Sequence, residues 1–179
     1  MSLPTWLAFF AASWAISFSP GPGAISAMAS GLKYGFRRGY WNSVGLLLGI
    51  LIQFLIVAVG LGALLSASET AFSIIKWLGV FYLIYLGWKQ FRTDAAPVAV
   101  EADDPAPFKA RDLVTRGCLI NITNPKGTVF LLAVVPQFLD PSAPLTLQYV
   151  ILAATLCFTD TVAMACYTTL AAQIGRAHV

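Results

Sequence analysis

The sequence predicts an all-α integral membrane protein, a polytopic helix bundle, on three observations. Hydrophobic residues make up 58% of the chain and charged residues 11%, against roughly 45–50% and 25% in soluble domains. The apolar residues come in long unbroken blocks. Two of these blocks, one in each half of the chain, are interrupted by stretches that contain proline and glycine. Such paired interruptions are typical of the binding site of a transporter.

The first interrupted block covers residues 3–29 and is broken at Ser19-Pro20-Gly21-Pro22-Gly23. Its prolines remove backbone donors, and its glycines permit conformations that are closed to other residues. Irregular backbone is tolerated at membrane depth only where protein buries it or where it lines a wet cavity. We therefore predict a discontinuous first helix whose break borders a cavity. The alternative is a kink that only lets helices pack closely.

The rest of the first half, residues 1–88, reads as two further spans. Residues 31–41 are expected to form a polar connection, and residues 44–65 a second span, because about 20 apolar residues cross the hydrocarbon core. A turn at residues 66–70 then leads to a third span at residues 72–88.

A hydrophilic stretch, residues 89–116, separates this half from the second one. Its proline, alanine and acidic residues predict a flexible cytoplasmic loop. The second half, residues 117–173, begins with an interrupted span at residues 117–139, broken at Asn124-Pro125-Lys126. A turn at residues 140–144 precedes a fifth span at residues 147–172, with Asp160 in its middle.

Lys and Arg are distributed unevenly between the connections. They occur in residues 31–41 and 89–116, whereas the turns around Glu69 and Asp140 contain neither. Because short cytoplasmic loops are enriched in Lys and Arg, we expect the basic loops in the cytoplasm and the N-terminus in the periplasm. The small net charge of +3 does not favour a nucleic-acid partner.

The chain ends in an unusual way. Residues 174–179 read IGRAHV, the string that one reading frame of a widely used sequencing adapter encodes. We expect this tail to be non-native and the natural chain to continue into a further span. His178 is therefore given no functional role.

Asp160 and Lys126 are the charged residues expected to carry chemistry. A carboxylate at mid-membrane costs at least about 2.5–3.5 kcal/mol, so an idle one is not expected. Desolvation favours its neutral form, which lets it bind and release a proton. We favour proton coupling or exchange with a substrate ammonium at Asp160, with pairing to Lys126 as the alternative. Lys126 itself is expected to hold a substrate carboxylate or to neutralise Asp160, unless it snorkels to the interface.

A solute that carries both charges needs an anion site and a cation site close together, and half-helix ends offer unpaired backbone groups with partial charges of both signs. We therefore predict substrate contacts at both breaks and at nearby polar side chains: Ser19, Pro20, Gly21, Pro22, Gly23, Gln53, Asn121, Asn124, Pro125 and Lys126. The alternative for the polar side chains is that they only hold helices together, at about 0.6 kcal/mol each. Asn42 is expected to cap the second helix.

The remaining reactive residues point away from an enzyme. Cys118, Cys157 and Cys166 form no CxxC pair, so we interpret them as small buried apolar residues and expect no redox carrier of the paired-cysteine type. Nothing in the sequence has the pattern of a hydrolase nucleophile set, a zinc site or a phosphate loop. We expect no catalysis, no cofactor and no metal.

The two breaks carry a family resemblance. Ser19-Pro20-Gly21-Pro22-Gly23, followed by Gly31-Leu32-Lys33-Tyr34-Gly35 and Arg38-Gly39, resembles the amino-terminal signature of the LysE/RhtB family of amino-acid exporters. Asn121-Ile122-Thr123-Asn124-Pro125-Lys126, with Pro136-Gln137-Phe138 and Asp160, resembles its second-half pattern. The resemblance covers residues 3–172. It implies six helices in two inverted three-helix halves, with the sixth helix missing here, and proton-driven export of amino acids or similar solutes across the bacterial inner membrane.

The sequence leaves three candidate functions. The leading one is a secondary transporter that exports amino acids by proton antiport. Export of a metal cation needs clustered carboxylates or thiolates, and the spans offer only Asp160 and scattered cysteines. A non-transport assembly role leaves Asp160 and both breaks unexplained. The expected partners are an amino-acid substrate, protons and the lipid bilayer, and two short halves are compatible with a homodimer.

Overall fold

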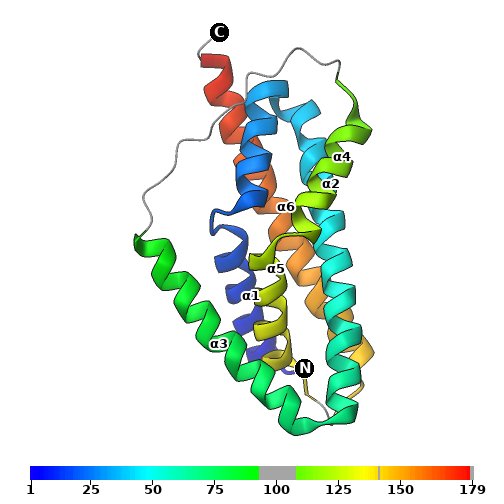
Figure 1. The fold of residues 1–179 in the computed structure, drawn as a ribbon. Helices are drawn as coiled ribbons and strands as arrows, with labels where there is room; N and C mark the ends of the chain where they lie inside the picture. Colours follow the sequence, from blue (N-terminus) through cyan, green and yellow to red (C-terminus); the bar gives the residue numbers. More distant parts are fainter. Residues whose placement is uncertain (93–107, 141, 178–179) are drawn as a thin grey trace.

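The structure, a computed structural model, describes residues 1–92, 108–140 and 142–177, and these contain helices and no strand. Figure 1 shows the helix bundle. Its elements are α1 (Leu3–Ser17), α2 (Pro22–Ala67), α3 (Glu69–Arg92), α4 (Ala110–Ile122), α5 (Pro125–Val134), the 3₁₀ helix η1 (Val135–Phe138) and α6 (Leu145–Ala177). The all-α membrane fold is confirmed. The stretch at residues 93–107, within the predicted loop, lies outside the described residues.

The first helix is broken as predicted. α1 ends at Ser17 and α2 begins at Pro22. Proline suits this first helical position because its missing N–H would have no partner there. The backbone N–H of Ile25 bonds to the carbonyl of Gly21 at 3.0 Å, which starts the hydrogen-bond ladder of α2.

α2 folds back on itself at Gly35, which has φ 69° and ψ 176°. Positive φ is readily accessible to glycine. The reversal brings a first arm, residues 22–34, against a second arm, residues 36–67. A Cβ atom on Gly39 would lie 2.5 Å from the carbonyl oxygen of Ser30, so the arms touch at their backbones. α2 therefore supplies the second part of the first span and the whole second span.

This hairpin corrects two predictions. The polar connection expected at residues 31–41 is helical on both sides of Gly35. Asn42 does not cap a helix: it is buried inside the second arm, and its side-chain amide donates to Ser26 Oγ at 3.0 Å. The charged residues of this stretch are exposed. Their polarity is typical of a loop, so the sequence did not indicate that the helices continue here.

The second half follows the prediction with one shift. α4 begins at Ala110, before the expected start of the span at residue 117. Its first two turns are helical although the charged side chains of Arg111, Asp112 and Arg116 are exposed. α4 and α5 meet at the second break with a bend of 53°. The side chain of Asn124 caps α5 by accepting the backbone N–H of Lys126 at 3.1 Å, in the manner typical of asparagine at a helix start.

Length and composition agree with several spans. Among the described residues, Pro22–Ala63 and Leu145–Gly175 are long and apolar enough to cross a membrane, and the bent pair Ala110–Ile122 with Pro125–Phe138 qualifies as a third span. The first of these ranges contains the Gly35 reversal. α3 follows α2 after a single residue, runs along the edge of the bundle in Figure 1 and packs on α5 where Gly79 meets Ala133.

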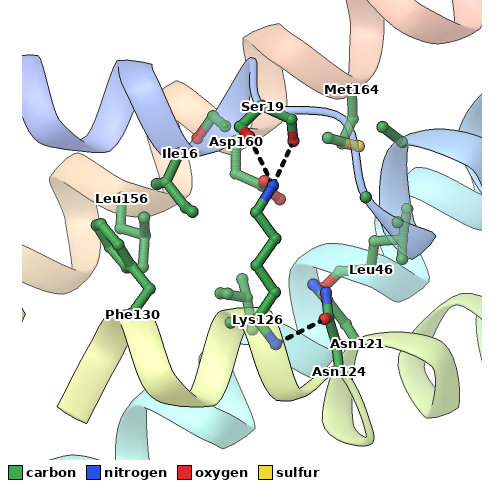
Figure 2. Close-up of a pocket in the computed structure, with 16 residues that line it drawn as sticks. Ile16, Ser19, Leu46, Asn121, Asn124, Lys126, Phe130, Leu156, Asp160 and Met164 are labelled. Atoms are coloured by element: carbon green, nitrogen blue, oxygen red, sulfur yellow. Dashed lines mark hydrogen bonds between the residues drawn. The ribbon is translucent and has the colours of Figure 1, made fainter. Parts of the chain in front are cut away.

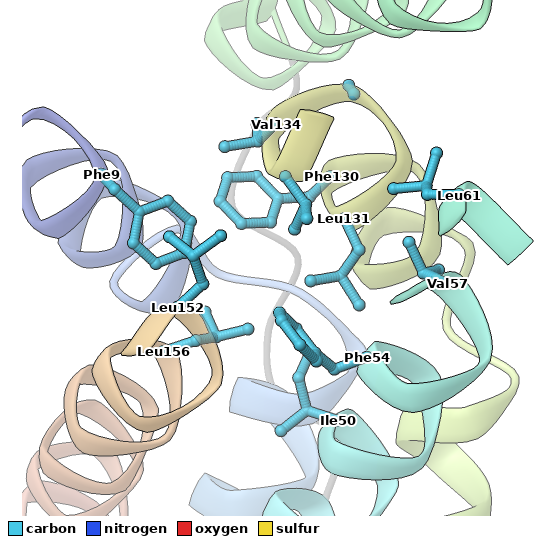
Figure 3. Close-up of a cluster of buried hydrophobic side chains, with 12 residues drawn as sticks. Phe9, Ile50, Phe54, Val57, Leu61, Phe130, Leu131, Val134, Leu152 and Leu156 are labelled. Carbon is cyan, nitrogen blue, oxygen red and sulfur yellow. The ribbon is translucent and has the colours of Figure 1, made fainter. Parts of the chain in front are cut away.

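Two apolar clusters form the interior. The larger joins α1, the second arm of α2, α5 and α6 around residues such as Phe9, Phe54, Phe130, Leu131 and Leu152 (Figure 3). The smaller joins both arms of α2 to α6 through Ala24, Ala27, Leu46, Ala163 and Met164. The space between these clusters holds the candidate site.

α2 and α4 cross at backbone distance. A Cβ atom on Gly49 would lie 2.7 Å from the carbonyl oxygen of Cys118, and one on Gly117 would meet the carbonyl oxygen of Asn42. Small residues allow such close approach between membrane helices.

The Gly35 reversal and the start of α4, both of which carry basic residues, lie together at one end of the bundle. The ring of Phe108, just before α4, packs edge-on against Tyr34 and 5.3 Å from the guanidinium carbon of Arg38. In Figure 1 this end also holds the C-terminus, while the N-terminus and the α2–α3 turn lie at the other end. Which end faces the cytoplasm stays a prediction.

Candidate functional site

A cavity lies between the two helix breaks (Figure 2). Its volume, as open to the centre of a water molecule, is about 60 Å³, which is room for a few water molecules. Its polar and glycine lining comes from Ser17, Ser19, Gly21, Gly23, Asn121, Asn124, Lys126, Gly127 and Asp160. Its apolar lining comes from Ile16, Ala24, Leu46, Ile50, Phe130, Leu156 and Met164. The cavity thus joins parts of the chain that are far apart in sequence.

Lys126 crosses this cavity from α5 to the first break. Its Nζ donates to Ser19 Oγ at 2.7 Å, to the Ser19 carbonyl oxygen at 2.9 Å and to the Pro20 carbonyl oxygen at 3.2 Å. An ammonium group has three donors, so all three find acceptors. A Cβ atom on Gly21 would lie 3.4 Å from Lys126 Cδ, so the glycine leaves room for the lysine chain. Lys126 therefore bridges the two breaks.

The carbonyl groups freed by the first break receive donors from other helices. Tyr167 on α6 donates its hydroxyl to the carbonyl oxygen of Phe18 at 2.7 Å. Lys126 donates to the carbonyl oxygens of the next two residues, Ser19 and Pro20. The last carbonyls of a helix have no intrahelical partner and need such external donors. Two of these three carbonyls are therefore capped by one charged side chain.

Asp160 projects from α6 into the same cavity. Its Oδ2 atom is buried and has no hydrogen-bond partner, although buried polar atoms are usually paired. The donors of Lys126 go to Ser19 and Pro20, so the structure does not use Lys126 to satisfy this oxygen. A buried acceptor that faces a cavity can take a proton or a cationic ligand.

The second break is held by a neutral side chain. Gln53 donates its amide Nε2 to the carbonyl oxygens of Ile122 and Asn124, both at 3.1 Å, and to Thr128 Oγ1 at 2.8 Å. Gln53 lies behind the break and outside the cavity lining. Its contacts are those of a positioning residue, which agrees with the alternative that it holds helices together.

Replacing Gln53 by leucine is expected to lower the stability of the folded protein by roughly 2 kcal/mol, because three acceptors lose a donor worth about 0.6 kcal/mol each in a membrane. Thermal unfolding in detergent measures the effect. Gln137→Leu is the control, since the exposed Gln137 amide donates only to Ala133 one turn back, at 2.9 Å. Equal stability of the two variants would contradict the role given to Gln53.

The asparagine pair links the second break to α2. Asn121 donates to the carbonyl oxygen of Leu46 at 2.6 Å, and its own oxygen accepts the side-chain amide of Asn124 at 3.4 Å. Both residues line the cavity. Asn121 Oδ1 also lies near Gly23, 3.8 Å from where a Cβ atom on that residue would be.

The predicted residues therefore divide into two groups. The structure brings Ser19, Gly21, Gly23, Asn121, Asn124, Lys126 and Asp160 to the cavity. It leaves Pro20, Pro22, Gln53 and Pro125 outside the lining, although the Pro20 carbonyl accepts from Lys126. Sequence reasoning missed Ser17, Gly127, the apolar wall and Tyr167. Ser17 and Gly127 lie next to the predicted breaks, and Tyr167 is a polar group on α6 two helical turns from Asp160.

A metal site has no support in the part of the chain that the structure describes, where no group of three His, Cys, Asp or Glu residues gathers.

The chain is similar to known proteins over most of its length. Residues 14–177 match the family model described as LysE type translocator. The chain is 41% identical over 176 residues to a homoserine/homoserine lactone efflux protein of Salmonella typhimurium, covering 98% of this chain and 84% of that protein. It is 38% identical to an uncharacterized membrane protein of Vibrio cholerae, covering 98% and 85%. A leucine efflux protein of Salmonella choleraesuis is 31% identical over 139 residues, covering 76% and 65%. No solved structure matches the chain.

Proposed function

Because the chain belongs to the LysE type translocator family, we propose that it exports small amino acids or their close derivatives across the bacterial cytoplasmic membrane by exchange for protons. The chain is a membrane transport protein and not an enzyme. The observation that carries the proposal is the buried, unpartnered Oδ2 of Asp160 in a cavity between two helix breaks.

The names of the relatives suggest which part of the substrate matters. Homoserine and leucine each carry an ammonium and a carboxylate, whereas homoserine lactone keeps the ammonium and has its carboxylate closed into a ring ester. The common group is the primary ammonium. Asp160 is the acidic side chain among the residues that line the cavity, so it is the natural counter-ion for that ammonium.

Competition for Asp160 gives a simple coupling scheme. The ionised carboxylate binds the substrate ammonium on the cytoplasmic side and releases it on the periplasmic side. A periplasmic proton then binds Asp160, the site with its neutral carboxyl group reopens to the cytoplasm, and the proton is released there before the next substrate ammonium binds. Three other titratable groups lie near Asp160: Lys126, which lines the same cavity, and Tyr40 and Cys157, which are close enough to interact with its charge. Because proton and ammonium cannot occupy the carboxylate together, the proton gradient drives export.

The orientation in this scheme is part of the proposal. At one end of the bundle, Lys33, Arg38 and Arg111 are exposed. Because cytoplasmic loops are enriched in Lys and Arg, this end is assigned to the cytoplasm. The N-terminus then lies in the periplasm. A homodimer remains a prediction of the sequence.

Transport into everted membrane vesicles tests the proposal. Their lumen is acidified by respiration, so the protein is expected to accumulate radiolabelled homoserine, homoserine lactone or leucine in the lumen, and a protonophore is expected to abolish the accumulation. N-acetylhomoserine, which has no ammonium, is the matched control and should not accumulate. Failure to move any of the amines, from folded protein, or equal transport of the acetylated compound would refute the proposal.

A further inference from the structure

We propose that Lys126 is a built-in occupant of the substrate's ammonium site and that a zwitterionic amino acid inserts between Lys126 and the first break. On insertion, the substrate ammonium takes over the acceptors of Ser19 and Pro20, and the released Lys126 ammonium binds the substrate carboxylate. Lys126 is then the residue that selects free amino acids over derivatives without a carboxylate. This inference rests on the proposed function and assigns a specificity role within the same cavity.

The acceptors at the first break form an ammonium site. Ser19 Oγ and the carbonyl oxygens of Ser19 and Pro20 surround one nitrogen, Lys126 Nζ, at 2.7–3.2 Å. A primary ammonium has three donors whatever molecule carries it. The Lys126 ammonium therefore stands in for the chemical group that the exported solutes share.

Lys126 is able to leave this site without unfolding a helix. Its ammonium sits on a flexible chain of four carbons, while its backbone is fixed at the start of α5 by the Asn124 cap. The extended chain passes beside Gly21, 3.4 Å from a Cβ atom built there. With the lysine in this position the cavity holds a few water molecules. Retraction of the chain enlarges it by the volume that the chain leaves.

Charge pairing favours a zwitterion as the inserted group. Before insertion, the ammonium of Lys126 contacts neutral oxygens, and Asp160 Oδ2 has no partner. After insertion, the substrate carboxylate faces Lys126, so this buried ammonium gains an opposite charge, and the substrate ammonium lies in the same cavity as the Asp160 carboxylate. Buried charges are costly unless they are paired in this way. A lactone supplies only the ammonium, and Lys126 then competes with it for the acceptors.

The test compares the KM values for homoserine and homoserine lactone in everted vesicles. Lys126→Met is expected to raise the KM for homoserine roughly 10- to 100-fold, the usual effect of losing a hydrogen bond to a charged group. The KM for the lactone is expected to stay unchanged or to fall, because the competing ammonium is gone. The ratio of the two KM values does not depend on how much protein is folded.

Two further variants separate selection from a structural role. Lys126→Arg keeps a cation for the carboxylate and is expected to retain the preference for homoserine. Ser19→Ala removes one acceptor for the ammonium that both solutes share, so it should raise both KM values by a similar factor and leave their ratio as in the wild type.

The outcomes distinguish this inference from the proposed function. If the wild type carries both solutes and Lys126→Met changes both KM values equally, the insertion model is overturned and the exporter stands. If Lys126→Met does not fold, loss of the homoserine preference in Lys126→Arg overturns the model, and its retention supports it. Absence of transport of either solute by the folded wild type overturns the proposed function and this inference together.

Discussion

Replacing Asp160 by asparagine is expected to abolish proton-driven accumulation of substrate. Asparagine keeps the shape of the side chain, but it neither ionises nor takes up a proton at the buried oxygen that faces the cavity. For a one-proton exchange, a pH difference of one unit sustains about a tenfold concentration ratio, because 1.36 kcal/mol corresponds to a factor of ten. In vesicles, that ratio should fall to about one in the variant, which no longer couples the two movements.

Proton release provides a direct measurement of the same coupling. In weakly buffered detergent solution, at a pH where Asp160 is protonated, substrate added to the wild-type protein is expected to release protons, because the bound ammonium stabilises the carboxylate. At higher pH, where Asp160 is already ionised, the release should disappear. Asp160→Asn should release no proton at any pH. Release that persists in this variant would move the coupling site to another group.

Asp140→Asn is the matched control for this experiment. Asp140 lies before α6, outside the spans, and accepts the hydroxyl of Ser142 at 2.6 Å and its backbone N–H at 3.0 Å. These hydrogen bonds, that of the hydroxyl first, hold the pKa of Asp140 below its usual range. Asp140 is therefore ionised near neutral pH, and its replacement should leave both proton release and accumulation unchanged.

Replacing Gly117 by valine is expected to prevent the bundle from assembling. A Cβ atom on Gly117 would meet the carbonyl oxygen of Asn42 and lie 2.9 Å from the backbone nitrogen of Leu46. These neighbours are backbone atoms of the second arm of α2, so no side chain can rotate away. Overpacking of this kind costs about 3 kcal/mol or more when the backbone has to move. Separation of α2 and α4 also removes the bond from Asn121 to Leu46.

Size-exclusion chromatography in detergent, followed by thermal unfolding, measures this loss. The folded, monodisperse peak should largely disappear for Gly117→Val. Gly60→Val is the control, because a Cβ atom on Gly60 meets nothing within 4 Å although Gly60 also lies in α2. A Gly117 variant as stable as the Gly60 variant would show that the two helices do not approach so closely.

Several features of the fold could be predicted from local sequence. The break between α1 and α2 follows from Pro20 and Pro22, because proline acts on the backbone of its own turn. The break before α5 follows in the same way from Pro125. A connection between the first two spans was predicted at residues 31–41, but its narrowing to a tight reversal at Gly35 was not, since the flanking residues are polar and the packing of the two arms sets the conformation, as in the bond between Ser26 and Asn42.

The roles of the polar side chains depended on long-range contacts. Gln53 and Lys126 are both polar residues in apolar segments, and their sequence surroundings do not tell them apart. In the structure, Gln53 binds the backbone of the second break and lies outside the cavity, whereas Lys126 reaches across it to the first break. These partners belong to other helices, so no local pattern reveals them.

The sequence by itself determined that this is a helical membrane protein with two broken spans and a carboxylate in an apolar segment. These properties depend on burial of apolar side chains and on the local geometry of proline, both of which act within a helix or less. Only the tertiary structure decided that Lys126 binds Ser19, 107 positions away, and that Asp160 faces the same cavity with an unpaired oxygen. Hydrogen-bond partners depend on where the helices cross, and the packing of the whole bundle sets those crossings.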